Sequence, residues 1–405
     1  MKKVVLLLAI CSPFLLHAQG FQVSLQGQKQ QAMAGAGTAL ISDGAALFYN
    51  PGGVSFLKQN SLSIGVTPVI SHAKFLDGSS STISETKSPT GTPFTGYVVL
   101  GKKQSKLKYG LAVYTPFGST ISWQNDWSGR FITTRVQLLS VYFQPTISYK
   151  ISEKLGIGAG FVYAIGKGNF YRDLPIVDDA GNYGKAELEG NSQGYGFNAG
   201  IYYKPISSLS FGITYRSGVE MDIKKGSAKF SVPASMAASF PSGDFSSTIK
   251  LPKILTFGAA FTPCKKLTLA FDASMIGWKT FDTLSFDYAK NTTELSDTKL
   301  SRNYKNTSSY RLGAQYSITN KFDARFGVKY LISPVDNGYV SPEVPDATHV
   351  NYSVGLGYKF SSRFAADVSF TFQGMERTDT NIETQLSGTY KTYIYMPGIS
   401  LNYNF

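Results

Sequence analysis

The sequence predicts an all-β fold: a transmembrane antiparallel β-barrel of about fourteen strands, with an N-terminal hatch, or plug, in its lumen. Three observations predict it. A polar turn between alternating strands recurs along the chain. Beyond the first residues, no apolar run reaches the about 18 residues that a membrane-spanning helix needs. The chain of 405 residues holds 25 Tyr, 28 Phe and 40 Gly, and only 16% of its residues are charged, which favours strands over helices.

Residues 1–18 are predicted to form a signal peptide. Two lysines precede an apolar run from Val4 to Leu16, and the small residue Ala18 stands before Gln19. This is the order of a positive region, a short apolar region and a cleavage site, and the run is too short to span a bilayer as a helix. We therefore expect an exported chain that starts near Gln19. Cys264 is then its single cysteine, so an intramolecular disulfide is not expected.

Residues 19–58 do not alternate and are predicted to form a hatch. The segment is rich in small residues, and a short helix is expected over 28–40, weakened by Gly35 and Gly37. It is too apolar for a disordered tail. Two arrangements follow: the segment hangs in the periplasm, or it folds inside the lumen. Glycines on the inward face of the wall, such as Gly156, Gly158 and Gly160, would make room for it.

The remainder, residues 59–405, is predicted to form the barrel because one hairpin pattern recurs. In it, an aromatic residue is followed by a polar turn and an apolar residue six positions on; the five copies begin at Tyr149, Tyr203, Phe261, Tyr316 and Tyr358. A looser sixth copy runs over 99–107. Six short turns join twelve strands, and a strand near 62–70 and a terminal strand complete fourteen. Short turns at one end and seven long connections at the other, one of them over 167–193, are typical of bacterial outer-membrane barrels.

The two faces of these strands predict which side meets lipid. One face carries apolar residues such as Phe161 and Phe326, whereas the opposite face carries charges such as Asp272 and Arg325. A closed barrel pairs every backbone group, as hydrocarbon requires, and a Lys or Arg at the bilayer midplane costs roughly 2–4 kcal/mol. Apolar residues are therefore expected outside and charges inside. A secreted β-sandwich also alternates, but the strand number and the asymmetry of the connections favour the barrel.

The last strand is predicted to pair with the first and close the ring. Alternate residues from Tyr393 to Phe405 are large and apolar, with few exceptions. Tyr403 and Phe405 at this end look like the terminal signal that the barrel assembly machinery of the outer membrane reads. That machinery is therefore an expected partner.

A set of short motifs stands out in two parts of the chain: Gly20-Phe21, Ala34–Gly37, Asp43, Phe48–Gly52, Tyr114–Gly118, Asp126–Arg130 and Phe143–Pro145. Together with the architecture of the whole chain, these motifs resemble the FadL/TodX family of outer-membrane transporters for long-chain fatty acids and other hydrophobic compounds. The family typically has Asn-Pro-Ala where this chain has Asn50-Pro51-Gly52, so Gly52 departs from the pattern.

The resemblance implies passive transport of hydrophobic compounds, in the first place long-chain fatty acids, across the outer membrane of a Gram-negative-type bacterium. Ligand would be caught by extracellular loops, pass to an apolar pocket, and leave sideways when the hatch moves and the wall opens at a kinked strand. The residues expected to line the path and gate are Phe21, Phe48, Tyr49, Asn50, Pro51 and Gly52. Pro116 and Gly118 are candidates for the kink, although an ordinary entry into a loop would also explain them.

A long loop holds a candidate capture site. Trp123, Trp127 and Phe131 would hold an acyl chain, and Arg130 a carboxylate; packing of the loop on itself is the alternative. The formal net charge is +13. Besides the hydrophobic ligand, outer-membrane lipid and anionic lipopolysaccharide are therefore expected partners. Nucleic acid is not expected, because the sequence has no dense run of Lys and Arg.

No enzyme activity, cofactor or metal is expected. No Cys/His cluster has metal-binding spacing. The alternatives to a transporter are a porin-like diffusion channel, a barrel hydrolase that would use His72 or His349, and an adhesin that would use the long loops.

Overall fold

The structure, a computed structural model, describes residues 20–102 and 105–405. The predicted signal peptide, residues 1–18, lies outside the described residues. Among the helices that the structure describes, none is both long and apolar enough to cross a membrane.

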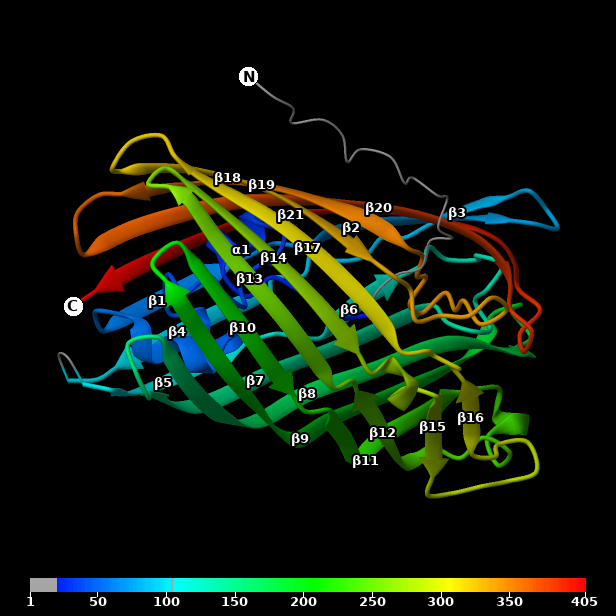
Figure 1. The fold of residues 1–405 in the computed structure, drawn as a ribbon. Helices are drawn as coiled ribbons and strands as arrows, with labels where there is room; N and C mark the ends of the chain where they lie inside the picture. Colours follow the sequence, from blue (N-terminus) through cyan, green and yellow to red (C-terminus); the bar gives the residue numbers. More distant parts are fainter. Residues whose placement is uncertain (1–19, 103–104) are drawn as a thin grey trace.

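The chain forms a closed antiparallel β-barrel of 14 strands (Figure 1). The ring closes where β21 (Ser387–Asn404) pairs with β1 (Ser61–Val66), with Tyr403 opposite Leu62, so the predicted pairing of the last strand with the first is confirmed. Several barrel strands consist of two segments. In chain order the strands are β1 with β2 (Ile70–Asp77), β3 (Ile83–Glu85) with β4 (Phe94–Leu100), β5 (Leu107–Tyr114) with β6 (Gly118–Ser122), β7 (Arg135–Lys150), β8 (Leu155–Val177), β9 (Tyr183–Ile206), β10 (Leu209–Arg216) with β11 (Val219–Ser231), β12 (Gly243–Leu251) with β13 (Ile254–Cys264), β14 (Leu267–Ile276), β17 (Thr307–Ser317), β18 (Phe322–Leu331), β19 (His349–Lys359), β20 (Phe364–Thr380) and β21.

One of the long connections is much shorter than the sequence predicted. A connection over 167–193 was expected, but β8 and β9 continue through it and leave only residues 178–182 between them. Polar side chains such as Lys167 are exposed on the outer face of this extension, as expected for strands that continue into water beyond the hydrocarbon layer. Between β14 and β17 the chain forms a separate hairpin of β15 (Thr283–Tyr288) and β16 (Thr298–Ser301). Two 3-10 turns lie in connections at this end of the barrel: η2 (Ala234–Met236) between β11 and β12, and η3 (Trp278–Thr280) between β14 and β15.

The predicted orientation of the two faces is confirmed. Phe161 and Phe326 are 54% and 51% exposed on the outside, as a lipid-facing surface requires. Asp272 and Arg325 are 1% and 5% exposed and face inward, where other polar groups contact them.

The N-terminal segment lies inside the barrel rather than below it (Figure 1). It contains α1 (Gln28–Ala32), α2 (Ala46–Tyr49) and η1 (Pro51–Phe56). Its polar groups bond to strands around the ring: the Gln31 amide donates to the Met396 carbonyl of β21 at 3.0 Å, and the Thr38 hydroxyl to Asp272 of β14 at 2.8 Å. The helix expected over 28–40 is shorter, because the chain turns at Ala34 and Gly35, which have positive φ.

Candidate functional site

The third barrel strand is interrupted where the sequence places Pro116 and Gly118. β5 ends at Tyr114 and β6 begins at Gly118. The second and third barrel strands pair at Thr95 with Tyr114 and meet again only at Thr86 with Trp123. Between these points, in the described chain, no backbone hydrogen bond joins residues 88–93 to residues 115–121. We call this stretch of the wall the seam.

The start of the N-terminal segment covers the seam from inside. Gln22 forms an antiparallel bridge with Phe117. On either side of that pair, the Val23 N–H donates to the Pro116 carbonyl at 2.8 Å, and the Gly118 N–H donates to the Phe21 carbonyl at 3.1 Å. The interrupted strand therefore completes its backbone pairing with the N-terminal segment rather than with its neighbour in the wall.

Phe21 anchors this short strand in an aromatic cluster. Its ring makes edge contacts with Phe117, Trp278 and Phe281, with centroids 6.2, 5.0 and 5.4 Å away, and is only 5% exposed. Such contacts between aromatic rings each contribute about 0.5–1.5 kcal/mol beyond area burial. The anchor is thus stable but consists of a few side chains, most of them from loops.

A buried carboxyl group holds the preceding residue. The Gly20 N–H and the Ser333 hydroxyl both donate to Asp346, at 3.0 and 2.9 Å. Burial in the loop between β18 and β19 raises the pKa of the Asp346 carboxyl to about 7, against the opposing effect of these bonds. The loop between β18 and β19 and the start of the N-terminal segment are therefore joined through one titratable group.

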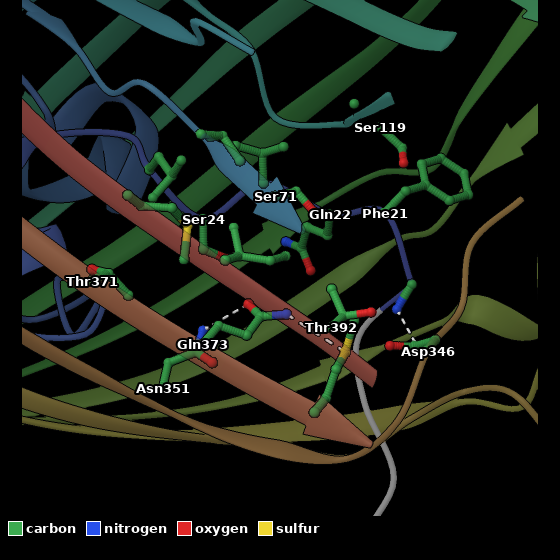
Figure 2. A pocket seen from close by; sticks show the side chains of 18 of the residues that line it. Phe21, Gln22, Ser24, Ser71, Ser119, Asp346, Asn351, Thr371, Gln373 and Thr392 are labelled. Carbon is green, nitrogen blue, oxygen red and sulfur yellow. Dashed lines mark hydrogen bonds between the residues drawn. The ribbon is translucent and has the colours of Figure 1, made fainter. Parts of the chain in front are cut away.

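A luminal cavity of about 180 Å³ lies behind the N-terminal strand (Figure 2). Its wall combines apolar groups with polar ones; examples of the apolar groups are Phe21, Val69, Ile121, Met375 and Met396, and of the polar ones Gln22, Ser71, Ser119, Asn351 and Gln373. Both edges of the seam contribute, through Val69 and Ser71 on one side and residues 118–121 on the other. The Lys329 amine reaches the cavity and donates to the Ser24 hydroxyl at 2.9 Å. The cavity thus offers a ligand both apolar surface and hydrogen-bonding groups.

Asn50, Pro51 and Gly52 lie deeper, against the wall. The Asn50 amide donates to the carbonyls of Thr38 and Ile201 at 2.8 and 3.0 Å, and its carbonyl accepts from the Gly52 N–H at 3.0 Å. One fully buried side chain therefore ties two parts of the segment to β9.

Glycines of the wall make this close approach possible, as predicted. A Cβ on Gly158 would lie 2.3 Å from the Pro51 carbonyl oxygen, and one on Gly200 would lie 2.3 Å from the Asn50 side-chain oxygen. Conversely, a Cβ on Gly52 would lie 2.5 Å from the Gly200 carbonyl oxygen. The departure from Asn-Pro-Ala thus coincides with a contact too close for alanine.

Phe48 and Tyr49 directly precede Asn50 in the chain. Phe48 lies next to Arg216, which the sequence did not identify as a site residue. The Arg216 guanidinium lies 4.2 Å from the centroid of the Phe48 ring, and it donates to the Phe48 carbonyl at 3.0 Å and the Tyr114 hydroxyl at 2.5 Å. The available signal was a charged residue on the inward face of β10, but nothing in the sequence identifies its partner.

The two tryptophans of the candidate capture site pack against each other. The rings of Trp123 and Trp127 stack with centroids 4.5 Å apart, and both side chains are buried. Their ring N–H groups donate to the carbonyls of Pro342 and Thr133 at 3.1 and 2.9 Å. The indoles therefore form the core of the loop in this structure, and contact with a ligand would require the loop to open.

Arg130 and Phe131 lie away from that pair. Arg130 forms an ion pair with Asp126 at 2.5 Å and lies 5.0 Å from the centroid of the Tyr183 ring. Phe131 contacts the same Tyr183, with centroids 5.1 Å apart. The four predicted capture residues are thus split into two groups, and their role in capture stays a prediction.

Two other sets of predicted residues have simple surroundings. Tyr403 and Phe405 lie on the outside with their rings stacked, and the Phe405 N–H donates to the Asn60 carbonyl at 3.0 Å.

His349 is buried, and its Nδ1 is 2.8 Å from the Ala347 carbonyl. In the part of the chain that the structure describes, no group of three or more His, Cys, Asp or Glu residues is placed to hold a metal ion.

Comparisons with known proteins agree with the fold. Residues 10–405 match the family model described as outer membrane protein transport protein (OMPP1/FadL/TodX). The chain is 24% identical to a long-chain fatty acid transport protein of Salmonella typhi, over 73% of each chain. A crystal structure of a Pseudomonas aeruginosa FadL homologue shares the fold with a TM-score of 0.83 at 18% identity, covering 96% of this chain and all of the other. The Pseudomonas putida toluene transporter TodX superimposes with a TM-score of 0.73 at 17% identity, covering 96% and 99%.

Proposed function

This chain belongs to the OMPP1/FadL/TodX family of outer membrane transport proteins, and on that premise we propose that it carries long-chain fatty acids passively across the outer membrane. The family handles hydrophobic compounds, and the relatives include one named for long-chain fatty acids and one named for toluene. A fatty acid suits the luminal cavity better than a pure hydrocarbon does, because Lys329 and several amide and hydroxyl groups lie among its apolar side chains.

One observation carries the proposal: a cavity bounded by both edges of the seam is closed by a strand that does not belong to the wall. Ligand that fills the cavity competes with Phe21 and Gln22 for the same space. When the N-terminal strand leaves Phe117, the seam opens from the cavity to the surrounding lipid. Each methylene that moves from water into an apolar environment gains about 0.8 kcal/mol, so the step into the membrane is downhill.

Residues 19–58 act as the hatch in this scheme, and 59–405 as the barrel. Asn50, Pro51 and Gly52 fix the hatch to the wall, while Phe21 with Phe48 and Tyr49 line the path. Trp123, Trp127, Arg130 and Phe131 collect ligand at the loops, next to lipopolysaccharide, and Tyr403 with Phe405 serve the assembly machinery. The protein works without catalysis. A porin-like channel would need the segment of residues 20–57 to leave the lumen.

The test is fatty-acid uptake by cells that lack another such transporter. The double variant Asn50→Ala/Pro51→Ala should reach the outer membrane at the normal level but take up radiolabelled oleate several-fold more slowly, because the Asn50 bonds that position the hatch are lost. Asn320→Ala, a change at an exposed turn outside both the luminal cavity and the cavity at the short-turn end, serves as control. Equal uptake rates for wild type and double variant would refute a gating role for these residues, and no uptake by the wild type would refute the proposal.

A further inference from the structure

A second cavity, separate from the luminal one, opens at the short-turn end of the barrel. Its volume is about 910 Å³, and it lies below the hatch, which contributes Ile41, Phe56 and Leu57. The ends of β5, β7 and β9 supply the rest of its wall, beside Asn404 at the C-terminal end of the chain (Figure 1). We call it the mouth cavity. None of the residues that line it lines the luminal cavity.

The lining of the mouth cavity is strongly basic. Five lysines line it, Lys58, Lys108, Lys150, Lys154 and Lys204, against two acidic residues, Asp43 and Glu153. Both acids already have a cation: Asp43 pairs with Lys29 at 3.3 Å, and Glu153 with Lys150 at 2.9 Å. The cavity therefore presents uncompensated positive charge beneath the hatch.

Lys108 distinguishes this site from an ordinary solvated basic surface. Its side chain points inward from β5 and the residue is only 4% exposed, yet it has no hydrogen-bond or ion-pair partner among residues 20–102 and 105–405. The ammonium group itself is not fully buried, so it reaches the cavity, where a cation without an anion beside it attracts one. The missing partner is thus expected to be an anion that enters from the cavity.

The rest of the wall indicates what kind of anion this is. Phe56, Leu57, Ile41 and Ile206 provide apolar surface within the same cavity, and ligand sites of about 300–1,000 Å³ commonly combine such surface with a few polar groups. Inorganic phosphate has no apolar part that could bury these side chains. An amphiphile with a carboxylate head and an alkyl chain matches both features.

We infer that the mouth cavity is a second ligand site, in which Lys108 binds the carboxylate of a fatty acid and the apolar residues of the hatch contact its first methylenes. This rests on the proposed function and extends it, because a fatty acid bound here has passed the hatch and faces the periplasm. The barrel then offers its ligand two exits, the seam toward lipid and the mouth cavity toward water.

The experiment uses the full-length mature barrel in a nonionic detergent, with a polarity-sensitive dye on Ser207→Cys at the rim of the mouth cavity and the exposed Cys264 changed to Ser. Decanoate should change the dye signal saturably.

Lys108→Met should raise the Kd for decanoate about tenfold or more, because a bond to a charged group is lost. Lys108→Arg should bind nearly normally, and Lys265→Met, at an exposed turn outside the mouth cavity, should have little effect. Decanol and inorganic phosphate distinguish the head group from the chain, and neither should compete well.

Each outcome decides the inference. Equal decanoate affinity for wild type and Lys108→Met, or phosphate that competes as well as decanoate, would overturn it while fatty-acid uptake by cells still supports the proposed function. Absence of any dye response in the wild type also overturns it, and uptake then shows separately whether the transport proposal stands. A folding defect in Lys108→Met is recognised by loss of heat-modifiable migration in gels, and Lys108→Gln then replaces it.

Discussion

A disulfide between Gln22→Cys and Phe117→Cys is expected to stop fatty-acid uptake, and its reduction is expected to restore it. The pair is suited to a disulfide because the backbone bonds flank it rather than join it: Val23 donates to Pro116, and Gly118 donates to Phe21. In antiparallel pairs of this kind the Cα atoms are about 4.5 Å apart, which lies within the range of natural disulfides.

The expected loss is large because the cross-link fixes the one strand that must leave the seam. If departure of that strand gates transport, oxidation should reduce the initial uptake rate about tenfold or more. The variant is built in a Cys264→Ser background so that the exposed native thiol cannot exchange. Each single cysteine variant, treated with the same oxidant, controls for the substitutions. Normal uptake by the fully oxidised protein would mean that ligand does not pass the seam.

A bulkier residue at Gly52 is expected to make a nearly silent barrel conduct ions. A Cβ at this position would lie 2.5 Å from the Gly200 carbonyl oxygen and 2.9 Å from that of Gly156. Both oxygens are backbone atoms of paired barrel strands, so they cannot move away as a side chain could. The hatch must therefore move in Gly52→Val, which breaks the Asn50 bonds to β9 and leaves a water-filled path through a lumen lined by charges.

The measurement is single-channel current in a planar bilayer. Gly52→Val should conduct steadily where the wild type shows rare openings, and Gly52→Ala should give an intermediate current. Gly96→Val is the matched control, because a Cβ at Gly96 has no neighbour within 4 Å. Equal currents in all four proteins, each with normal heat-modifiable migration, would contradict a hatch held by this contact. Steady conduction by the wild type would instead favour the porin-like channel.

Much of the barrel follows from local physics and was predictable. Alternation of apolar and polar residues fixes which side chains meet lipid, and polar turns such as those after Tyr149 and Tyr358 fix the hairpins. The extent of β8 and β9 beyond the membrane was not predictable in this way. Outside the bilayer no apolar face is required, so polar strands such as the one around Lys167 resemble loops in sequence.

The candidate site was predictable only in its parts. Pro116 and Gly118 suggested a kink, and the small residues of the hatch suggested a plug, but the bridge from Gln22 to Phe117 joins segments about a hundred positions apart. Such pairing leaves no local periodicity. The same holds for Arg216 over Phe48, and for Trp123 and Trp127, whose aromatic character fits a ligand site and a packed loop equally well.

The most direct test of the account is to locate a fatty acid on the protein in its own membrane. A radiolabelled fatty acid with a photoreactive group at the end of its chain is added to cells, illuminated, and mapped by mass spectrometry of peptides. The account predicts labels on residues 20–25, on 69–71 and on 118–121, which together surround the luminal cavity and the seam. Labels confined to the outer face around Phe161 and Phe326, with none in the lumen, would contradict it.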